Sequence, residues 1–150
     1  MGQTTIHIRH LQPEDLDAII DIDERMTGQH RREYWDKRFE LSALRPSWMS
    51  LVAEAEGRVA GFLFGWTSGW EFGVPGSAGW IDVIGVDPPF RGRGIGQALA
   101  RRFIAAAEEL RGIKKVFTLI HPEQQGIAGF FKALGFQRGP MIQMEKTIGA

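Results

Sequence analysis

The chain lacks cysteine and asparagine altogether and has a single tyrosine among its 150 residues. Without cysteine it can form no disulfide, no thiolate metal site and no cysteine-linked acyl-enzyme. The same absence is typical of cytoplasmic proteins, and no apolar leader segment is evident after Met1. We therefore expect a cytoplasmic protein.

An excess of charge of one sign is also missing, because 18 Lys and Arg residues balance 18 Asp and Glu residues. A chain without a global basic field is not expected to recruit nucleic acid or an anionic membrane surface. No apolar run approaches the roughly 20 residues that a membrane-spanning helix requires. The four histidines show no metal-ligand spacing, so we expect no metal.

The apolar periodicity predicts one strand, two helices, three strands, one helix, one strand, one helix and two final strands. The strands are predicted at 5–9, 50–55, 58–66, 78–86, 115–120, 136–138 and 141–146, and the helices at 13–24, 31–44, 95–110 and 125–134. Parallel pairing requires a long connection, so only strands after the late helices can pair in parallel. We predict a single domain, residues 1–150, with a mixed, mostly antiparallel α/β sheet of about seven strands and helices on both faces.

A glycine-rich turn, residues 91–97, joins the apolar strand 78–86 to the helix that follows. A strand, turn and helix in this order direct backbone N–H groups and the positive end of a helix dipole toward one place. Arg91 and Arg93 add positive charge there. The turn therefore predicts a binding site for a phosphate-type anion.

Other glycine motifs do not fit this turn. A dinucleotide fingerprint needs a third glycine, but Gln97 and Leu99 stand at the two positions where it would fall. The Gly-Lys-Ser/Thr of a phosphate-binding P-loop is absent, and so is the Gly-x-Ser-x-Gly of a nucleophile elbow.

The pattern Arg91-x-x-Gly94-x-Gly96, preceded by Val86-Asp87-Pro88, resembles the pyrophosphate-binding turn of the GCN5-related N-acetyltransferase (GNAT) superfamily. Residues 124–136 are similar to a second motif of that family, Asn-x-x-Ala-x-x-x-Tyr-x-x-x-Gly-Phe, and the predicted element order agrees across nearly the whole chain. The resemblance implies a GNAT fold, acetyl-CoA as co-substrate and direct acetyl transfer to a primary amine in a ternary complex.

The resemblance also implies which residues contact CoA. Backbone groups from Ile84 to Val86 would align the pantetheine arm, and the Val86 N–H would meet the thioester oxygen. The full set expected to bind the co-substrate is Ile84, Val86, Arg91, Gly92, Arg93, Gly94, Ile95, Gly96, Gln97, Gln124 and Phe131.

Two positions depart from the family pattern. Gln124 replaces the family asparagine, and Phe131 replaces a tyrosine that protonates the leaving thiolate in many members. A thiol with a pKa of roughly 8.5 is a modest leaving group, so protonation is not obligatory. Tyr34 is the only phenol that can replace the missing acid. The departure leaves open an alternative, a CoA-binding sensor or regulatory module with little catalysis.

Asp82 is the candidate general base, because it is the one acidic residue in the otherwise apolar strand 78–86. We expect it to share a face with Trp80 and Ile84, and burial would raise its pKa. Such a carboxylate can take a proton from an ammonium, or it can equally serve as a structural partner or an anchor for the substrate amine. Glu71 is the second candidate and His121 the third.

The acceptor is not identified by any motif, and a small molecule, a protein N-terminus and a lysine all remain open. We expect its pocket to be formed by the first two helices and the 66–80 segment. The basic residues of helix 31–44 are interpreted as a solvated face. A homodimer is possible because dimers are common in the family that the chain resembles.

Overall fold

The computed structural model describes residues 4–44, 49–110 and 112–149. Contacts between Cα atoms divide the chain into an N-terminal unit, Met1–Leu119, and a C-terminal unit, Ile120–Ala150. The single domain predicted for residues 1–150 stays a prediction.

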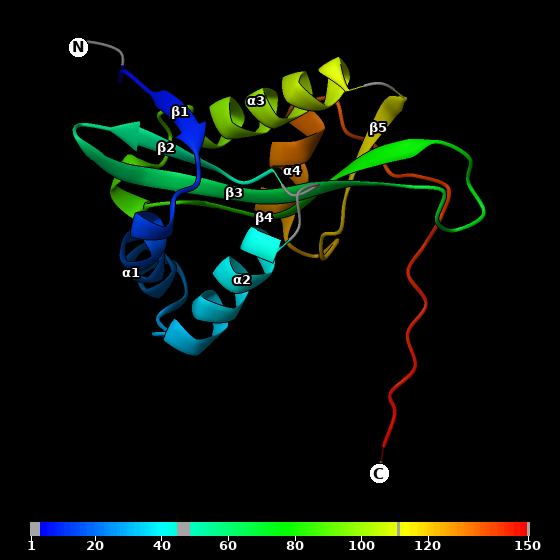
Figure 1. Ribbon diagram of the computed structural model, residues 1–150, viewed down its shortest axis with the longest axis horizontal. Coiled ribbons are helices and arrows are strands. Elements are labelled where there is room, and N and C mark those ends of the chain that lie inside the picture. The colour runs from blue at the N-terminus through cyan, green and yellow to red at the C-terminus, as the bar shows by residue number, and fades with distance from the viewer. Residues whose placement is uncertain (1–3, 45–48, 111, 150) are drawn as a thin grey trace. The chain divides into compact units, whose positions relative to one another are not determined.

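A five-stranded sheet forms the centre of the N-terminal unit, with its strands in chain order (Figure 1). The strands are β1 (His7–His10), β2 (Leu51–Ala55), β3 (Arg58–Gly69), β4 (Ser77–Val86) and β5 (Ile113–Thr118). Neighbouring strands are antiparallel except β4 and β5, which are parallel. The predicted mixed α/β sheet is therefore confirmed, with five strands in the described residues rather than about seven.

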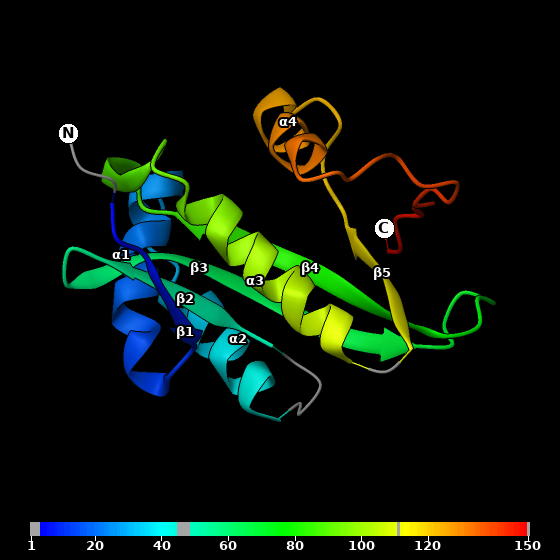
Figure 2. The ribbon, with the colours of Figure 1, turned by 90° about the horizontal axis from the view of Figure 1, so that it is seen from above.

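Helices cover both faces of this sheet, as predicted. In Figures 1 and 2, α1 (Leu16–Thr27) and α2 (Arg32–Leu44) lie on one face, and α3 (Ile95–Glu109) lies on the other. Short 3-10 helices, η1 (Pro13–Asp15) and η2 (Pro88–Phe90), precede α1 and α3. Among the described residues, no helix combines the length and the apolar character needed to cross a membrane.

The face under α1 and α2 holds the main apolar cluster. The Trp35 ring lies 5.3 Å from the Phe62 ring and 5.5 Å from the Phe64 ring, measured between centroids. Each fully buried side chain of this size contributes roughly 1.5–3 kcal/mol of transfer free energy. The buried members of the cluster are Ile19, Ile20, Ile22, Trp35, Val52, Phe62 and Phe64.

Glycines let α3 lie close against the other face of the sheet. A Cβ atom on Gly65 would be 2.4 Å from the Phe103 ring and 2.7 Å from the Trp80 carbonyl oxygen. Such distances leave no room for a side chain, so Gly65 is required by the close approach of the helix. At the start of α3, next to the glycine-rich turn, Gly61 allows a similar approach, since a Cβ atom there would be 2.9 Å from the Ile95 side chain.

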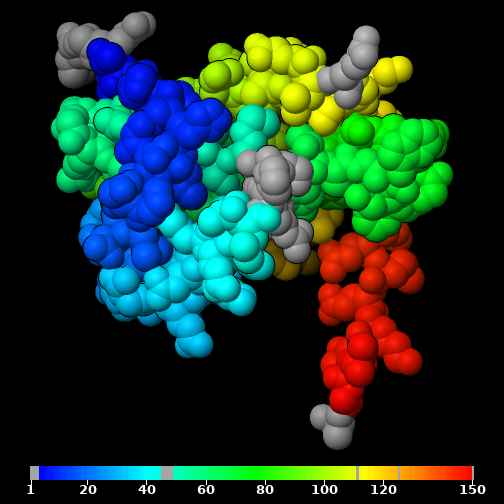
Figure 3. Space-filling view, viewed as in Figure 1, coloured from blue at the N-terminus to red at the C-terminus, as the bar shows by residue number. Residues whose placement is uncertain are grey.

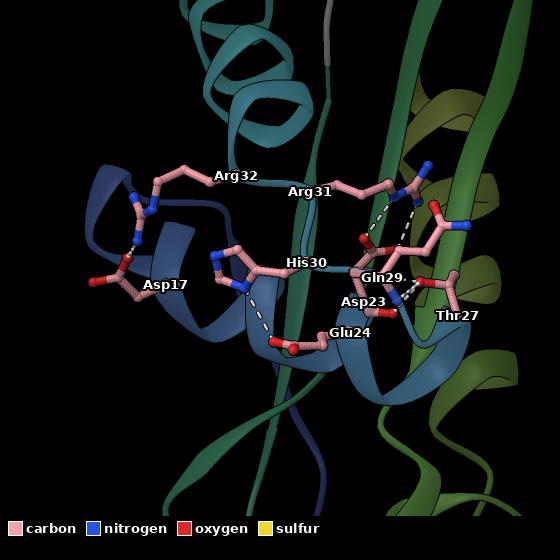
Figure 4. Close-up of polar contacts among 8 residues, drawn as sticks. All are labelled: Asp17, Asp23, Glu24, Thr27, Gln29, His30, Arg31 and Arg32. Atoms are coloured by element: carbon pink, nitrogen blue, oxygen red, sulfur yellow. Dashed lines mark hydrogen bonds and ion pairs between the residues drawn. The ribbon is translucent and has the colours of Figure 1, made fainter.

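A buried ion pair closes the junction between α1 and α2 (Figure 4). Arg31 donates two hydrogen bonds to Asp23, at 2.7 and 2.9 Å, and the Asp23 side chain is 4% exposed. Burial acts to raise the pKa of Asp23, but the hydrogen bonds of Arg31, the nearby Trp35 indole and the charge of Arg31 together outweigh it and hold that pKa below its usual value. Arg31 is thus a structural partner, which the expected solvated helix face did not anticipate.

The C-terminal unit contains one helix, α4 (Gln125–Ala133), in its described residues. The strands predicted at 136–138 and 141–146 are absent there, and residues 137–149 are exposed. That prediction is wrong for this structure. A strand forms only where a neighbouring strand pairs with its backbone, and no described strand pairs with these two segments.

Candidate functional site

One edge of β4 is open over its second half, because β5 leaves it there (Figure 2). The pairing of β4 with β5 runs from Ser77 to Ile81, and β5 ends at Thr118, whose hydroxyl donates to the Ile81 carbonyl at 2.9 Å. Among the described residues, no strand pairs with 82–86 on this edge. Backbone groups there are available to an extended ligand.

The N–H groups of Ile84 and Val86 point toward this open edge. The Asp87 N–H donates to the Ala60 carbonyl of β3 at 2.8 Å. Because hydrogen-bonded and non-hydrogen-bonded positions alternate along an antiparallel pair, Gly85 also faces β3, and residues 84 and 86 face the opposite edge. These are the two backbone positions that the sequence placed beside the pantetheine arm.

A β-bulge lies at Asp82. The register of β4 with β3 shifts between Phe64 and Gly65, and Asp82 is the extra residue of β4. Directly opposite residues share a face of a sheet, so the bulge places Trp80 and Ile84 on opposite faces. The expected single face for residues 80, 82, 84 and 86 is therefore wrong. The alternation of apolar and polar residues in a sequence does not reveal that a bulge has inserted one extra residue into the strand.

Asp82 forms an ion pair with Arg38 of α2. The two side chains are 25% and 15% exposed, and the Arg38 guanidinium lies 5.4 Å from the centroid of the Phe64 ring. The carboxylate is thus partly exposed and has a cationic partner, instead of lying isolated in an apolar strand. Arg38 follows the buried Trp35 by three residues, a spacing that indicates the same helix face.

The second carboxylate candidate, Glu71, lies in the exposed loop between β3 and β4, which projects at one end of the sheet (Figures 1 and 3). Its neighbours Trp70 and Phe72 are 75% and 74% exposed and adopt positive φ angles of 68° and 57°. The Phe72 ring lies 6.4 Å from that of Trp80. The loop therefore presents a carboxylate between two solvent-facing aromatic rings.

The glycine-rich turn leaves a run of backbone N–H groups without backbone partners. The Arg91 N–H donates to Pro88 at 3.2 Å, and the Ala98 N–H donates to Gly94 at 3.0 Å. Within the described chain, no backbone carbonyl accepts from the N–H groups of residues 92–97. Together with the N-terminus of α3, these groups have the arrangement that the predicted anion site requires.

Two of the three glycines of this turn are required by their backbone conformation. Gly92 and Gly94 have φ angles of 77° and 82°, in the left-handed region, and a Cβ atom on either would meet nothing within 4 Å. The Ile95 side chain is buried, so only its backbone faces the turn, and Gln97 is exposed. Arg91 and Arg93 are also exposed, and Gly96 is partly buried.

Asp87 anchors the turn, a role that the sequence analysis did not assign. Its fully buried carboxylate accepts hydrogen bonds from Arg25 of α1, at 2.8 and 3.0 Å, and from Arg58 of β3, at 3.0 Å. The hydrogen bond to Asp87 raises the pKa of the Arg25 guanidinium. The motif around Asp87 was visible in the sequence, but its distant arginine partners were not.

The remaining candidates of the second motif lie in the C-terminal unit. The Gln124 N–H donates to the His121 carbonyl at 3.0 Å, and both side chains are exposed. Phe131 is buried and packs against Phe130 and Phe136 at centroid distances of 5.0 and 5.1 Å. The Phe131 ring is therefore buried among other aromatic side chains, as is typical of an apolar side chain.

Two further features concern proton transfer and metals. Tyr34 is 38% exposed, and the Arg31 guanidinium lies 4.6 Å from its ring centroid. In the part of the chain that the structure describes, no group of three or more His, Asp or Glu side chains can hold a metal ion.

Known proteins resemble this chain in sequence over most of its length. A family model described as the Acetyltransferase (GNAT) family matches residues 16–136. An uncharacterised N-acetyltransferase of Methanocaldococcus jannaschii is 30% identical over 148 residues, which cover 93% of this chain and 64% of that relative. The chain therefore spans just under two thirds of the length of this curated relative.

Solved structures with the same fold support this similarity. An aminoglycoside N-acetyltransferase, AAC(6')-Iy, in complex with CoA has a TM-score of 0.81 at 18% identity, and the match covers 97% of both chains. The glucosamine-6-phosphate N-acetyltransferase of Arabidopsis thaliana has a TM-score of 0.73 at 25% identity and covers 97% of this chain and 99% of its own.

Proposed function

Because this chain belongs to the GNAT family of acetyltransferases, we propose that it transfers an acetyl group from acetyl-CoA directly to a primary amine. One observation carries the proposal: the open edge of β4 leads directly into the exposed N–H groups of the glycine-rich turn. An extended chain ending in a pyrophosphate matches such a surface, and acetyl-CoA has that form.

The proposed donor site divides CoA between two parts of the N-terminal unit. The N–H groups of residues 92–97 and the start of α3 hold the pyrophosphate. The N–H groups of Ile84 and Val86 hold the pantetheine arm and, at Val86, polarise the thioester carbonyl. The roles in CoA binding that the family motif implies for Gln124 and Phe131 stay predictions.

Acetyl transfer requires a base that deprotonates the acceptor ammonium, and it releases CoA as a thiolate. We propose that the Asp82 carboxylate accepts a proton from the acceptor ammonium, directly or through a water molecule. The amine nitrogen then bonds to the carbonyl carbon, the carbon–sulfur bond breaks, and CoA leaves as a thiolate. The nitrogen gives up its second proton to solvent as the amide forms, and the thiolate takes a proton from solvent. Arg38 orients the Asp82 carboxylate. Glu71 is the alternative base.

The acceptor is proposed to bind beside the aromatic loop between β3 and β4. Trp80 stacks on Trp66 at 6.3 Å with an interplanar angle of 16°, and Phe72 adds a third ring nearby. The names of two structural neighbours describe acetyl transfer to aminoglycosides and to glucosamine-6-phosphate, which supports an amine acceptor without identifying it. A cytoplasmic location and a homodimer stay predictions.

The proposal is tested by thiol release from acetyl-CoA in the presence of a panel of amines that includes aminosugars, polyamines, lysine peptides and free protein N-termini. We expect release above the hydrolytic background with at least one amine. Tight CoA binding without turnover on any amine would favour the sensor or regulatory module instead. Thermal stabilisation by ATP but not by acetyl-CoA would contradict both functions, since a selective ligand stabilises the state that binds it.

A further inference from the structure

A row of aromatic rings crosses three strands at the loop end of the sheet. Trp66, Trp80 and Phe117 stand opposite one another on β3, β4 and β5. The Trp80 ring lies 6.3 Å from that of Trp66, at an interplanar angle of 16°, and 5.0 Å from that of Phe117. A fourth ring, Phe72 of the loop between β3 and β4, lies 6.4 Å from Trp80. We call these four residues the aromatic platform.

The strand residues of the aromatic platform face the side of the sheet on which α1 and α2 lie. Gly65 and Gly79, which precede the two tryptophans, face Phe103 of α3. Because successive side chains of a strand point to opposite faces, Trp66 and Trp80 point away from α3. The loop end of β3 and β4 extends past α2 (Figures 1 and 2), and all three strand residues of the platform are only partly buried. A ligand can therefore reach the rings from this face.

The loop between β3 and β4 holds Phe72 in place. The Trp70 N–H donates to the Gly76 carbonyl at 2.9 Å, and the Val74 N–H donates to the Glu71 carbonyl at 3.0 Å. Positive φ angles at Trp70 and Phe72 cost these bulky residues free energy, and such strain clusters at ligand-binding segments. Both rings are nonetheless mostly exposed, as is typical of apolar side chains that bind a partner.

Asp82, the proposed base, lies beside the aromatic platform on the same face. Its ion pair with Arg38 directs the carboxylate toward α2, and it follows Trp80 by two residues on β4. Since a strand rises about 3.3 Å per residue, Trp80 and Asp82 are at most roughly 7 Å apart along β4. An acceptor whose ammonium meets Asp82 therefore places a group one short linker away against the Trp80 ring.

The charges around the aromatic platform suit one ammonium rather than several. In the described residues of the loop, of β4 and of β5, the charged side chains are Glu71, Asp82, Lys114 and Lys115, and Arg38 pairs with Asp82. Carboxylates are thus outnumbered by positive charges, which disfavours a polycationic acceptor. An aromatic ring, in contrast, binds through stacking and apolar burial, which require no excess of charge.

We propose that the aromatic platform selects an arylalkylamine as the acetyl acceptor, a small primary amine joined by a short alkyl linker to one aromatic ring. The inference rests on the proposed function, because it names the class of amine that the same site acetylates. Trp80 binds the ring of the acceptor, and Phe72 packs against that ring from the loop. Asp82 receives the ammonium at the other end of the linker.

The test compares kcat/KM for 2-phenylethylamine, propylamine, glucosamine and spermidine, measured by thiol release from acetyl-CoA on the full chain. The wild type acetylates 2-phenylethylamine at least about tenfold more efficiently than the other three amines. W80L lowers the efficiency with 2-phenylethylamine about tenfold through a higher KM, and it affects propylamine far less. L110A, which removes an exposed apolar side chain at the end of α3, leaves the preference unchanged.

Each contrary result has a distinct meaning. Acetylation of propylamine, glucosamine or spermidine as efficiently as 2-phenylethylamine would overturn the acceptor class while leaving the acetyltransferase activity intact. Equal losses with 2-phenylethylamine and propylamine in W80L, or no loss at all, would show that Trp80 does not bind the ring, which also contradicts the inference. If no amine is acetylated, the proposed function fails as well. Should W80L unfold, F72A gives the same comparison, because the Phe72 side chain is exposed.

Discussion

Asp82 shows at the scale of a single residue how the structure changes a sequence-based interpretation. The sequence placed it alone in an apolar strand, whereas the structure places it at a bulge and in an ion pair with Arg38. A bulge re-aims a side chain and often lies next to an active site. Asp82 can therefore act as a base or tie α2 to β4, and the two roles require different tests.

Substitution of Asp82 separates these roles when it is compared with substitution of its partner. If Asp82 is the base, D82N lowers kcat by roughly 10²-fold and alters the pH profile, whereas its Kd for CoA stays unchanged. R38Q retains the carboxylate and keeps far more activity than D82N. Both changes break the same ion pair and lower Tm to a similar degree.

The measurements are kcat against pH, thermal unfolding and CoA titration on the same preparations. Equal losses of activity in D82N and R38Q would assign Asp82 a structural role and leave Glu71 as the remaining carboxylate candidate.

The glycine-rich turn is an element whose local structure can be predicted from the sequence, although its anchoring cannot. The sequence predicted it correctly, because each link is local: an apolar strand, glycines for a left-handed backbone and an amphipathic helix. The anchoring of the turn by Asp87 was not predictable, since Arg25 and Arg58 lie far from it in sequence. The periodicity of apolar residues predicts which face of a helix or strand is buried. It does not predict which charged residues, distant in sequence, form an ion pair.

G94A tests the turn, with G112A as its matched control. Both glycines have positive φ, 82° and 86°, and at both a Cβ atom would meet nothing within 4 Å. Each alanine therefore carries a similar backbone penalty of about 1–2 kcal/mol. We expect G94A to weaken CoA binding about tenfold more than G112A does, because only Gly94 caps α3 at the anion site. Calorimetric titration with CoA measures this, and equal effects would contradict it.

The strands predicted after α4 illustrate a different limit. Residues 141–146 include the apolar residues Met141, Ile142 and Met144, yet the whole segment is exposed and unpaired in the structure. Strand formation depends on a neighbour, and a sequence pattern reports only that a segment suits one. The helices, whose backbone hydrogen bonds are internal, agree closely with their predicted ranges.

At the scale of the whole molecule, the prediction of one domain implies one cooperative unfolding transition. All five tryptophans precede residue 120, so tryptophan fluorescence reports only on the N-terminal unit. Gly129 lies in α4 of the C-terminal unit, where a Cβ atom would meet nothing within 4 Å. Alanine there favours the helix by up to about 1 kcal/mol.

We therefore expect G129A to raise the midpoint of the fluorescence-detected transition by a few degrees, roughly 2–4 °C. Thermal unfolding followed by fluorescence and by far-UV circular dichroism checks this, and the two curves should coincide. If G129A leaves the midpoint of the fluorescence-detected transition unchanged, and the two probes show two separate transitions, the two units unfold independently.

We infer that CoA lies along the open edge of β4 and in the glycine-rich turn. Amide hydrogen exchange, followed residue by residue by NMR with and without CoA, tests this inference. We expect new protection at the N–H groups of Ile84, Val86 and residues 92–97, whereas Asp87, already bonded to Ala60, changes little. Protection confined to other segments, or none at saturating CoA, would contradict it.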